Sequence, residues 1–221
     1  MAGDERPPEM PPEVPPKIPR GAQGRTPVDD WLLGSAEIML GNEKGLARLD
    51  ASASGFAASF WGLAIAALID AFTLVLRYRL RFTGEEDAAT TAWSLPGYVI
   101  ASLAIALLAY AAGVLTLYLL ARDPREQARL PLLIVAHNWA APTVSLAVVP
   151  LAIALSSGLI VAGGSSGVIA TVALLGILAV VGVRLIRIPL GIPFPKALGW
   201  FALSFLVGLV LSEWLENLFG L

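Results

Sequence analysis

LPLLIVAHNWAAPTVSLAVVPLAIALSSGLIVAGGSSGVIATVALLGILAVVGV, from Leu130 to Val183, decides the fold, because these 54 residues carry no formal charge at neutral pH. A helix needs about 20 apolar residues to cross the roughly 30 Å hydrocarbon core of a bilayer. The segment is therefore long enough for two crossings, and a glycine-rich stretch at 158–167 divides it. It predicts a transmembrane helical hairpin with spans at about 131–155 and 167–188.

The same count of uncharged residues identifies three more spans outside this hairpin. They lie at about 55–76, 96–120 and 197–219. With 57% hydrophobic and only 14% charged residues, the chain departs strongly from soluble domains, in which about a quarter of the residues are charged. The sequence predicts an all-α polytopic membrane bundle of five transmembrane helices within residues 51–221.

Two segments of different character precede the first span. Residues 1–27 contain 8 of the 16 prolines and predict a disordered, solvated polyproline-II tail. Residues 28–50 show a helical pattern but carry too many charges to span, so they predict an amphipathic segment. This segment either lies on the membrane surface or packs under the bundle, and its glycines leave open whether it forms one helix or two short pieces.

Basic residues are unevenly distributed between the two sides of the membrane. Twelve lie on the amino-terminal side and in the loops at 121–130 and 184–196, whereas three (Arg77, Arg79 and Arg81) follow the first span. Basic loops remain predominantly on the cytosolic side. We therefore expect a cytosolic amino terminus in a cell membrane, with the bacterial inner membrane as the expected location.

Common catalytic and cofactor motifs are missing from the sequence. It contains no G-x-S-x-G, no H-E-x-x-H and no P-loop, and with no cysteine and one histidine it cannot form Cys-type zinc sites or His-pair metal sites. The net charge of -2, without basic residues clustered among aromatics, gives no attraction to nucleic acid. We therefore expect a protein that is not an enzyme, with no cofactor, no metal and no nucleic-acid partner.

Asp70 is the clearest candidate for a functional group within the membrane. A charge at bilayer depth costs at least about 2.5–3.5 kcal/mol on insertion scales. Asp70 lies seven residues before Arg77, and so on roughly the same helix face. The carboxylate either pairs with this arginine, or ends a shorter span, or acts as a protonatable group in a transport path.

The most unusual local cluster is His137-Asn138-Trp139, which is followed by Pro142. Pro142 has no N–H to donate to the Asn138 carbonyl, so this carbonyl needs another partner in a region where water is scarce. Tyr110 of the second span reaches a similar depth if the two helices are neighbours. The cluster forms either interhelical hydrogen bonds that hold the bundle together or a substrate or proton site.

A stripe of small residues runs along the last span. Ser204, Gly208 and Ser212 follow one another at i+4 spacing. Small residues let another backbone approach closely, either within one chain or between chains. The possible partners are therefore the lipid bilayer, other membrane proteins and a second copy in a homo-oligomer.

Two stretches resemble a group of uncharacterised bacterial integral-membrane proteins. GLARLDASASGFAASF at 45–60 resembles the Gly-Leu…Phe-Asp…Ser…Gly-Phe…Ser-Phe entry to that group's first span, and IVAHNW at 134–139 is similar to its Ile-Val-Ala-Tyr-Asn-Trp stretch. Leu49 and His137 stand where the group has aromatic residues. Members of this group are sometimes labelled transporter-like. In topology, five spans with a cytosolic amino terminus are also distantly similar to the Yip family of membrane-trafficking proteins.

These features support two functional hypotheses. The favoured one is a non-enzymatic multi-pass membrane protein that acts through protein or lipid contacts, of a scaffold or trafficking and assembly type. The alternative is a small secondary transporter or proton-coupled channel that uses Asp70 and the helix break at His137-Asn138. Five spans do not divide into two equal inverted halves, which disfavours the alternative.

Overall fold

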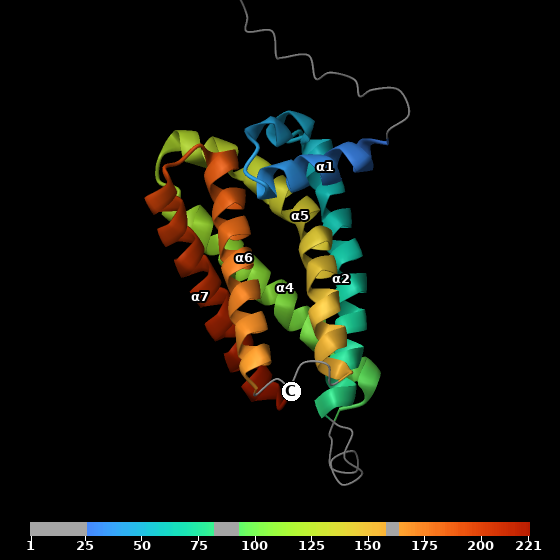
Figure 1. Cartoon of the computed structure of the whole chain (residues 1–221). Coiled ribbons are helices and arrows are strands. Elements are labelled where there is room, and N and C mark those ends of the chain that lie inside the picture. Colours follow the sequence, from blue (N-terminus) through green and yellow to red (C-terminus); the bar gives the residue numbers. More distant parts are fainter. Residues whose placement is uncertain (1–25, 82–92, 158–163) are drawn as a thin grey trace, which may run out of the picture.

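Five long helices form the core of the structure, a computed structural model that describes residues 26–81, 93–157 and 164–221. They are α2 (Ala53–Arg81), α4 (Leu95–Leu120), α5 (Pro124–Ser156), α6 (Ser165–Leu190) and α7 (Phe194–Phe219) (Figure 1). Each is long and apolar enough to cross a membrane. The prediction of an all-α bundle with five spans is confirmed, and the chain is a multi-pass membrane protein.

The helices extend beyond the predicted spans. α2 continues to Arg81, and α5 already begins at Pro124. Counting uncharged residues measures the thickness of the hydrocarbon, whereas a helix continues into the headgroup region for as long as its backbone remains bonded. Pro189 lies inside α6, and the helix ends two residues later at Gly191, whose φ of +66° lies in the left-handed region.

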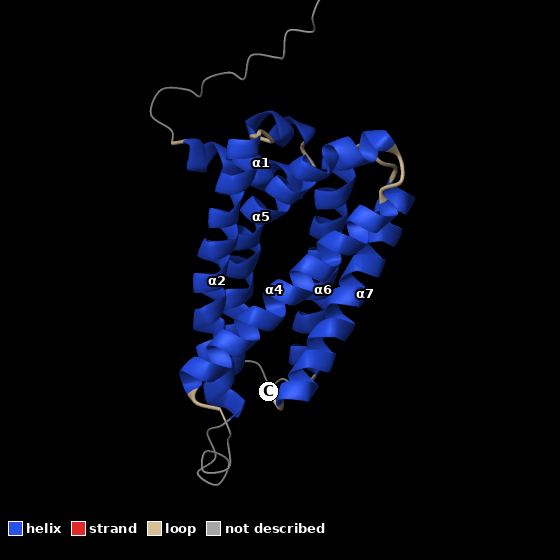
Figure 2. Cartoon of the chain, turned by 180° about the vertical axis from the view of Figure 1, so that it is seen from behind, coloured by secondary structure: helices blue, strands red, loops and turns tan. Residues whose placement is uncertain are grey.

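Successive long helices run in opposite directions, so the α4–α5 and α6–α7 turns lie at the same end of the bundle. We call this the α1 end, because α1 (Pro27–Met39) lies across it. α2 packs along α5, and α4 packs along α7. Seen from behind, α4 crosses obliquely from the foot of α2 toward the upper part of α7 (Figure 2). α4 thereby links the two pairs.

The amphipathic segment forms two pieces rather than one helix. α1 is followed by the 3₁₀ helix η1 (Glu43–Arg48), and Gly41, with φ of +92°, makes the turn between them. Thr26 and Asp29 form a capping box at the start of α1, in which each backbone N–H donates to the other side chain at 3.0 and 3.3 Å. Residues 1–25, which hold most of the predicted tail, lie outside the described part of the chain.

α1 is packed onto the bundle. Ile38 and Ser35 are fully buried, and the Ser35 hydroxyl lies 3.0 Å from the Trp139 carbonyl of α5. Arg184 of α6 donates to the Met39 carbonyl at the end of α1, at 2.8 Å. Of the two placements expected for this segment, packing against the bundle is the one that the structure shows.

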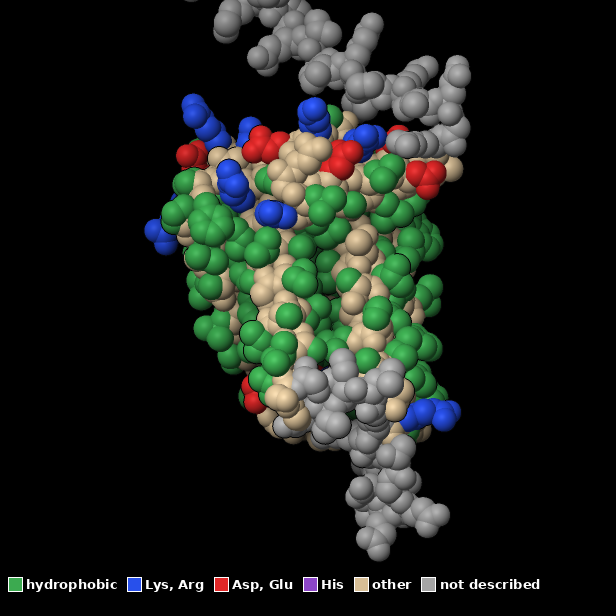
Figure 3. All heavy atoms as spheres, in the orientation of Figure 1, with side chains coloured by type: hydrophobic (Ala, Val, Ile, Leu, Met, Phe, Trp, Pro, Cys, Tyr) green, Lys and Arg blue, Asp and Glu red, His purple; other side chains and the backbone are tan. Residues whose placement is uncertain are grey.

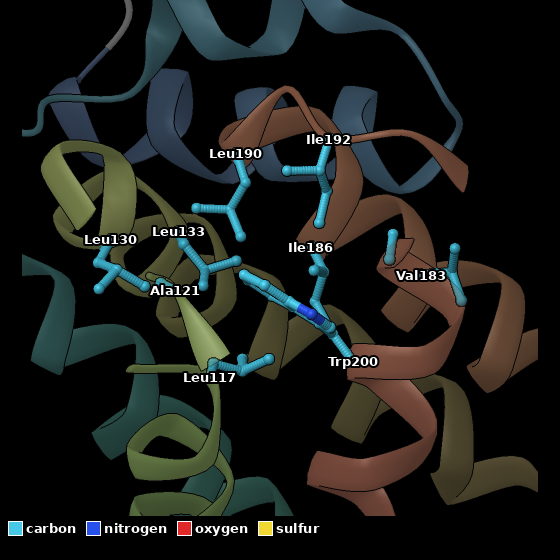
Figure 4. Close-up of a cluster of buried hydrophobic side chains, with 10 residues drawn as sticks. Leu117, Ala121, Leu130, Leu133, Val183, Ile186, Leu190, Ile192 and Trp200 are labelled. Atoms are coloured by element: carbon cyan, nitrogen blue, oxygen red, sulfur yellow. The ribbon is translucent and has the colours of Figure 1, made fainter. Parts of the chain in front are cut away.

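A cluster around Trp200 fills the bundle near the α1 end (Figure 4). Leu117 from α4, Leu133 from α5 and Ile186 from α6 all lie against this ring system. Between the two ends, apolar side chains cover the outside of the bundle (Figure 3), as a surface in contact with lipid requires. Burial within the chain and exposure to lipid thus use the same kinds of residue.

The small-residue stripe of α7 packs against α4 of the same chain. A Cβ added to Gly208 would lie 3.4 Å from the Ala109 carbonyl oxygen. A Cβ added to Gly113 would lie 3.7 Å from the Ser204 carbonyl oxygen. The stripe therefore works within the chain, so it offers no support for a homo-oligomer.

The closest approach of α2 to α5 is at Gly62. A Cβ at this position would overlap the carbonyl oxygen of Asn138, so only glycine lets the two backbones come this near. On α6, by contrast, a Cβ at Gly176 would meet nothing within 4 Å. Two helical glycines in the same bundle thus differ completely in what a methyl group would meet.

We predict opposite effects for alanine at these two glycines. Gly62→Ala should destabilise the bundle by about 1–3 kcal/mol, because the added methyl group forces α2 away from α5. Gly176→Ala should leave stability unchanged or raise it by up to about 1 kcal/mol, since alanine is the better helix former. Reversible unfolding in mixed micelles measures both. Equal stabilities for the two variants would show that α2 does not approach α5 as described.

Candidate functional site

Asn138 of α5 lies at the centre of a chain of hydrogen bonds that joins three helices. The Tyr110 hydroxyl of α4 donates to Asn138 Oδ1 at 2.6 Å, and Asn138 Nδ2 donates to Ser59 Oγ of α2 at 2.8 Å. Ser59 Oγ donates in turn to the Phe56 carbonyl at 2.7 Å. Asn138 and Ser59 are both fully buried. Tyr110 and Asn138, which the sequence placed at a similar depth, are thus in direct contact.

The backbone carbonyl of Asn138 also contacts a neighbouring helix. Pro142 sits inside α5 and leaves the Asn138 carbonyl without its usual donor four residues later. Gly62 of α2 faces this oxygen, and its Cα–H points toward it. Such Cα–H···O contacts are individually weak, yet they recur where helices meet closely. The partner that the freed carbonyl required is therefore the backbone of a neighbouring helix.

His137 points away from this network, toward α4 and α7. Its Nδ1 lies 3.2 Å from the Leu133 carbonyl, which can only accept, so Nδ1 is the donor in this contact. The side chain lines a groove of about 470 Å³ together with Tyr110 and the stripe residues Ser204, Gly208 and Ser212. The histidine and the small-residue stripe, which lie far apart in the sequence, therefore share one groove.

A second groove, of about 390 Å³, lies on the other side of Tyr110. Residues of α2, α4 and α5 line it, among them Phe56, Phe60 and Leu133. Its lining is apolar apart from the two tyrosine hydroxyls, on Tyr110 and Tyr118. Such a surface suits the hydrocarbon of a lipid and offers little to a polar substrate.

Asp70 has a different partner from the one expected. Ser145 of α5 is the polar side chain beside its carboxylate. Arg77 instead pairs with Glu216 of α7 at 3.4 Å, and α2 continues past Asp70 to Arg81. The expected Asp70–Arg77 pair is therefore wrong, because Arg77 pairs with Glu216. The shorter span stays a prediction, since a helix can continue beyond the hydrocarbon. The face of α2 that carries Asp70 is turned toward α5, while the long arginine side chain extends to the end of the bundle where Glu216 lies.

The structure does not bring the candidate residues together into one site. Ser145, the partner of Asp70, lies eight residues beyond His137, or about 12 Å along α5. The two positions also face different helices, α2 for Ser145 and α4 with α7 for His137. Among the described residues, no group of three or more acidic or histidine side chains could hold a metal ion.

Ser59, Gly62 and Ser145 also belong to these contacts, although they were not among the residues predicted from the sequence. A signal for the first two was present, because Gly55, Ser59 and Gly62 form a stripe of small residues at spacings of four and three. It is the same pattern that drew attention to the stripe in α7. Ser145 had no such signal, since one serine in an apolar helix is ordinary.

No protein-family model, curated protein or solved structure matches this chain. The resemblance of residues 45–60 and 134–139 to a bacterial membrane-protein group therefore stays a prediction. In the structure these two stretches meet, because Ser59 belongs to the first and Asn138 to the second. Their contact gives a physical reason for both patterns to occur in one chain.

We predict that Tyr110→Phe destabilises the bundle by about 0.6–1.7 kcal/mol, the range measured for interhelical hydrogen bonds in a membrane protein. The substitution leaves Asn138 Oδ1 without its donor. Tyr118→Phe is the matched control, since Tyr118 lies on the same helix and is 58% exposed on the outside of the bundle. Unfolding of both variants in bicelles is the measurement. A loss that is equal in the two variants would argue against the Tyr110–Asn138 bond.

Proposed function

We propose that this multi-pass membrane protein is not an enzyme and acts through contacts with lipid or with other membrane proteins, as a scaffold or an assembly or trafficking factor does. We further propose that it resides in the bacterial inner membrane with its amino terminus in the cytosol. The uneven distribution of basic residues supports this orientation.

The proposal rests on one observation: the side chains of Tyr110, Asn138 and Ser59 bond to one another at the centre of the bundle. Asn138 uses its amide oxygen for Tyr110 and its amide nitrogen for Ser59. A substrate site needs convergent polar groups that remain available to a ligand. A network whose donors and acceptors are used within the protein stabilises the fold and leaves little for recognition.

A small transporter or proton-coupled channel is the second candidate, and one observation favours it. The His137 side chain lines the groove between α4 and α7, and its Nε2 has no hydrogen-bond partner among the described residues. A proton path needs a continuous relay, however, and Asp70 lies about two helical turns away on another face. The two groups on which this hypothesis depends thus do not form a pair.

Liposomes that contain the full chain and an entrapped pH dye separate the two hypotheses. We predict that an imposed pH gradient decays as it does in protein-free vesicles, and that His137→Gln and Asp70→Asn change neither this decay nor the stability. Gln still offers a donor and an acceptor but has no accessible proton equilibrium.

Two results together would favour the channel. The first is proton flux that depends on the protein. The second is the loss of this flux in His137→Gln, provided that the variant unfolds like the parent chain. Asp70→Asn would then show whether the acidic group belongs to the same path.

A further inference from the structure

Charges at the α1 end are separated into an acidic half and a basic half. Residues 26–52, which include α1 and η1, carry five carboxylates and two basic residues, for a net charge of -3. The α4–α5 and α6–α7 turns, at 121–129 and 184–196, carry six basic residues and two carboxylates, for a net charge of +4. In Figure 3 blue side chains predominate on the left of this end, and red ones predominate over α1.

Some basic residues at the α1 end have hydrogen-bond or ion-pair partners within the described part of the chain, and others have none there. Arg48 pairs with Asp30 and Glu37 in the acidic half. In the turns, Lys196 pairs with Glu126, and Arg184 donates to the Met39 carbonyl. Four exposed arginines of these two turns have no carboxylate within 4.0 Å among the described residues: Arg122, Arg125, Arg129 and Arg187.

Three of these arginines lie on the two segments that meet where α5 begins and α6 ends. Arg125 and Arg129 lie four residues apart, on one face of α5. The guanidinium of Arg129 lies against Gly191, which follows Arg187 by one helical turn. We call Arg125, Arg129 and Arg187 the α5–α6 basic patch.

An apolar surface continues from this patch along the outside of α6. Val180 and Ile177 are exposed there, about two to three helical turns from Arg187. Both residues belong to α6, which is long and apolar enough to cross a membrane. A molecule that fits both surfaces has an anionic head and hydrocarbon chains.

We propose that the α5–α6 basic patch binds the phosphate headgroup of an anionic phospholipid, whose acyl chains lie along α6. Arginine suits this role, because its planar fork matches phosphate oxygens with two parallel hydrogen bonds. The acidic half at α1 repels the same headgroup, so the lipid is held on one side of the protein. This inference rests on the proposed function, since it names a lipid class for contacts that the proposal leaves general.

Native mass spectrometry of the full chain with phosphatidylglycerol or phosphatidylcholine tests the site. We expect tighter binding of phosphatidylglycerol, weakened about fivefold for each arginine replaced and about 100-fold in the triple variant Arg125→Gln, Arg129→Gln, Arg187→Gln. Phosphatidylcholine binding should not change. Inorganic phosphate in millimolar excess should not displace the lipid, because it lacks the chains.

The matched control removes the same charge elsewhere, with Lys44→Gln, Arg77→Gln and Arg79→Gln. It should bind phosphatidylglycerol like the parent chain. If the triple patch variant fails to fold, Arg125→Gln with Arg187→Gln keeps the Arg129–Gly191 contact and should lose about 25-fold.

Three results would overturn the site: no preference for phosphatidylglycerol, an equal loss in the patch variant and the control, or displacement by inorganic phosphate. None of these results would support the channel hypothesis, which the measurement of proton flux in liposomes tests independently. Conversely, flux that depends on His137 would refute the proposed function and leave the lipid measurement unaffected.

Discussion

The approach of α2 to α5 at Gly62 and Asn138 is the contact on which the rest of the bundle depends. Pro142 frees the Asn138 carbonyl in a region without water, and Gly62 lets the α2 backbone come against it. That proximity brings Ser59 within reach of the Asn138 side chain, whose other end accepts from Tyr110 and so fixes α4. The carbonyl of the next residue, Trp139, accepts a hydrogen bond from the Ser35 hydroxyl and thereby holds α1 in place. Three helices, α1, α2 and α4, are thus positioned by two adjacent residues of α5.

The number and approximate limits of the spans could be predicted, because hydrocarbon thickness imposes them on any chain through the length of its uncharged runs. The similar depth of Tyr110 and the His137-Asn138 cluster could also be predicted, since depth in the membrane can be counted along each helix. Partners across helices could not be derived in this way. Asp70 lies beside Ser145, and Arg77 pairs with Glu216. These neighbours depend on which face of α2 meets α5, and a count of charges along the sequence does not reveal how a helix is rotated.

The basic patch illustrates the same limit. Arg129 and Arg187 are almost sixty residues apart and show no cluster in the sequence, yet Arg129 lies against Gly191 at the end of α6. The bundle thus combines a polar centre whose groups bond to one another with a periphery whose charges are unevenly distributed. Such an arrangement suits a protein that acts at its surface, toward lipid or toward other membrane proteins, better than one that acts through its interior.

A double-mutant cycle between Ser59 and Asn138 tests most directly whether the contact of α2 with α5 organises the bundle. Ser59→Ala, Asn138→Ala and the double variant would be unfolded reversibly in bicelles beside the parent chain. The account predicts a coupling free energy of about 0.6–1.7 kcal/mol between the two positions. Losses that add to within about 0.3 kcal/mol would show that the two side chains do not interact, and would contradict the account.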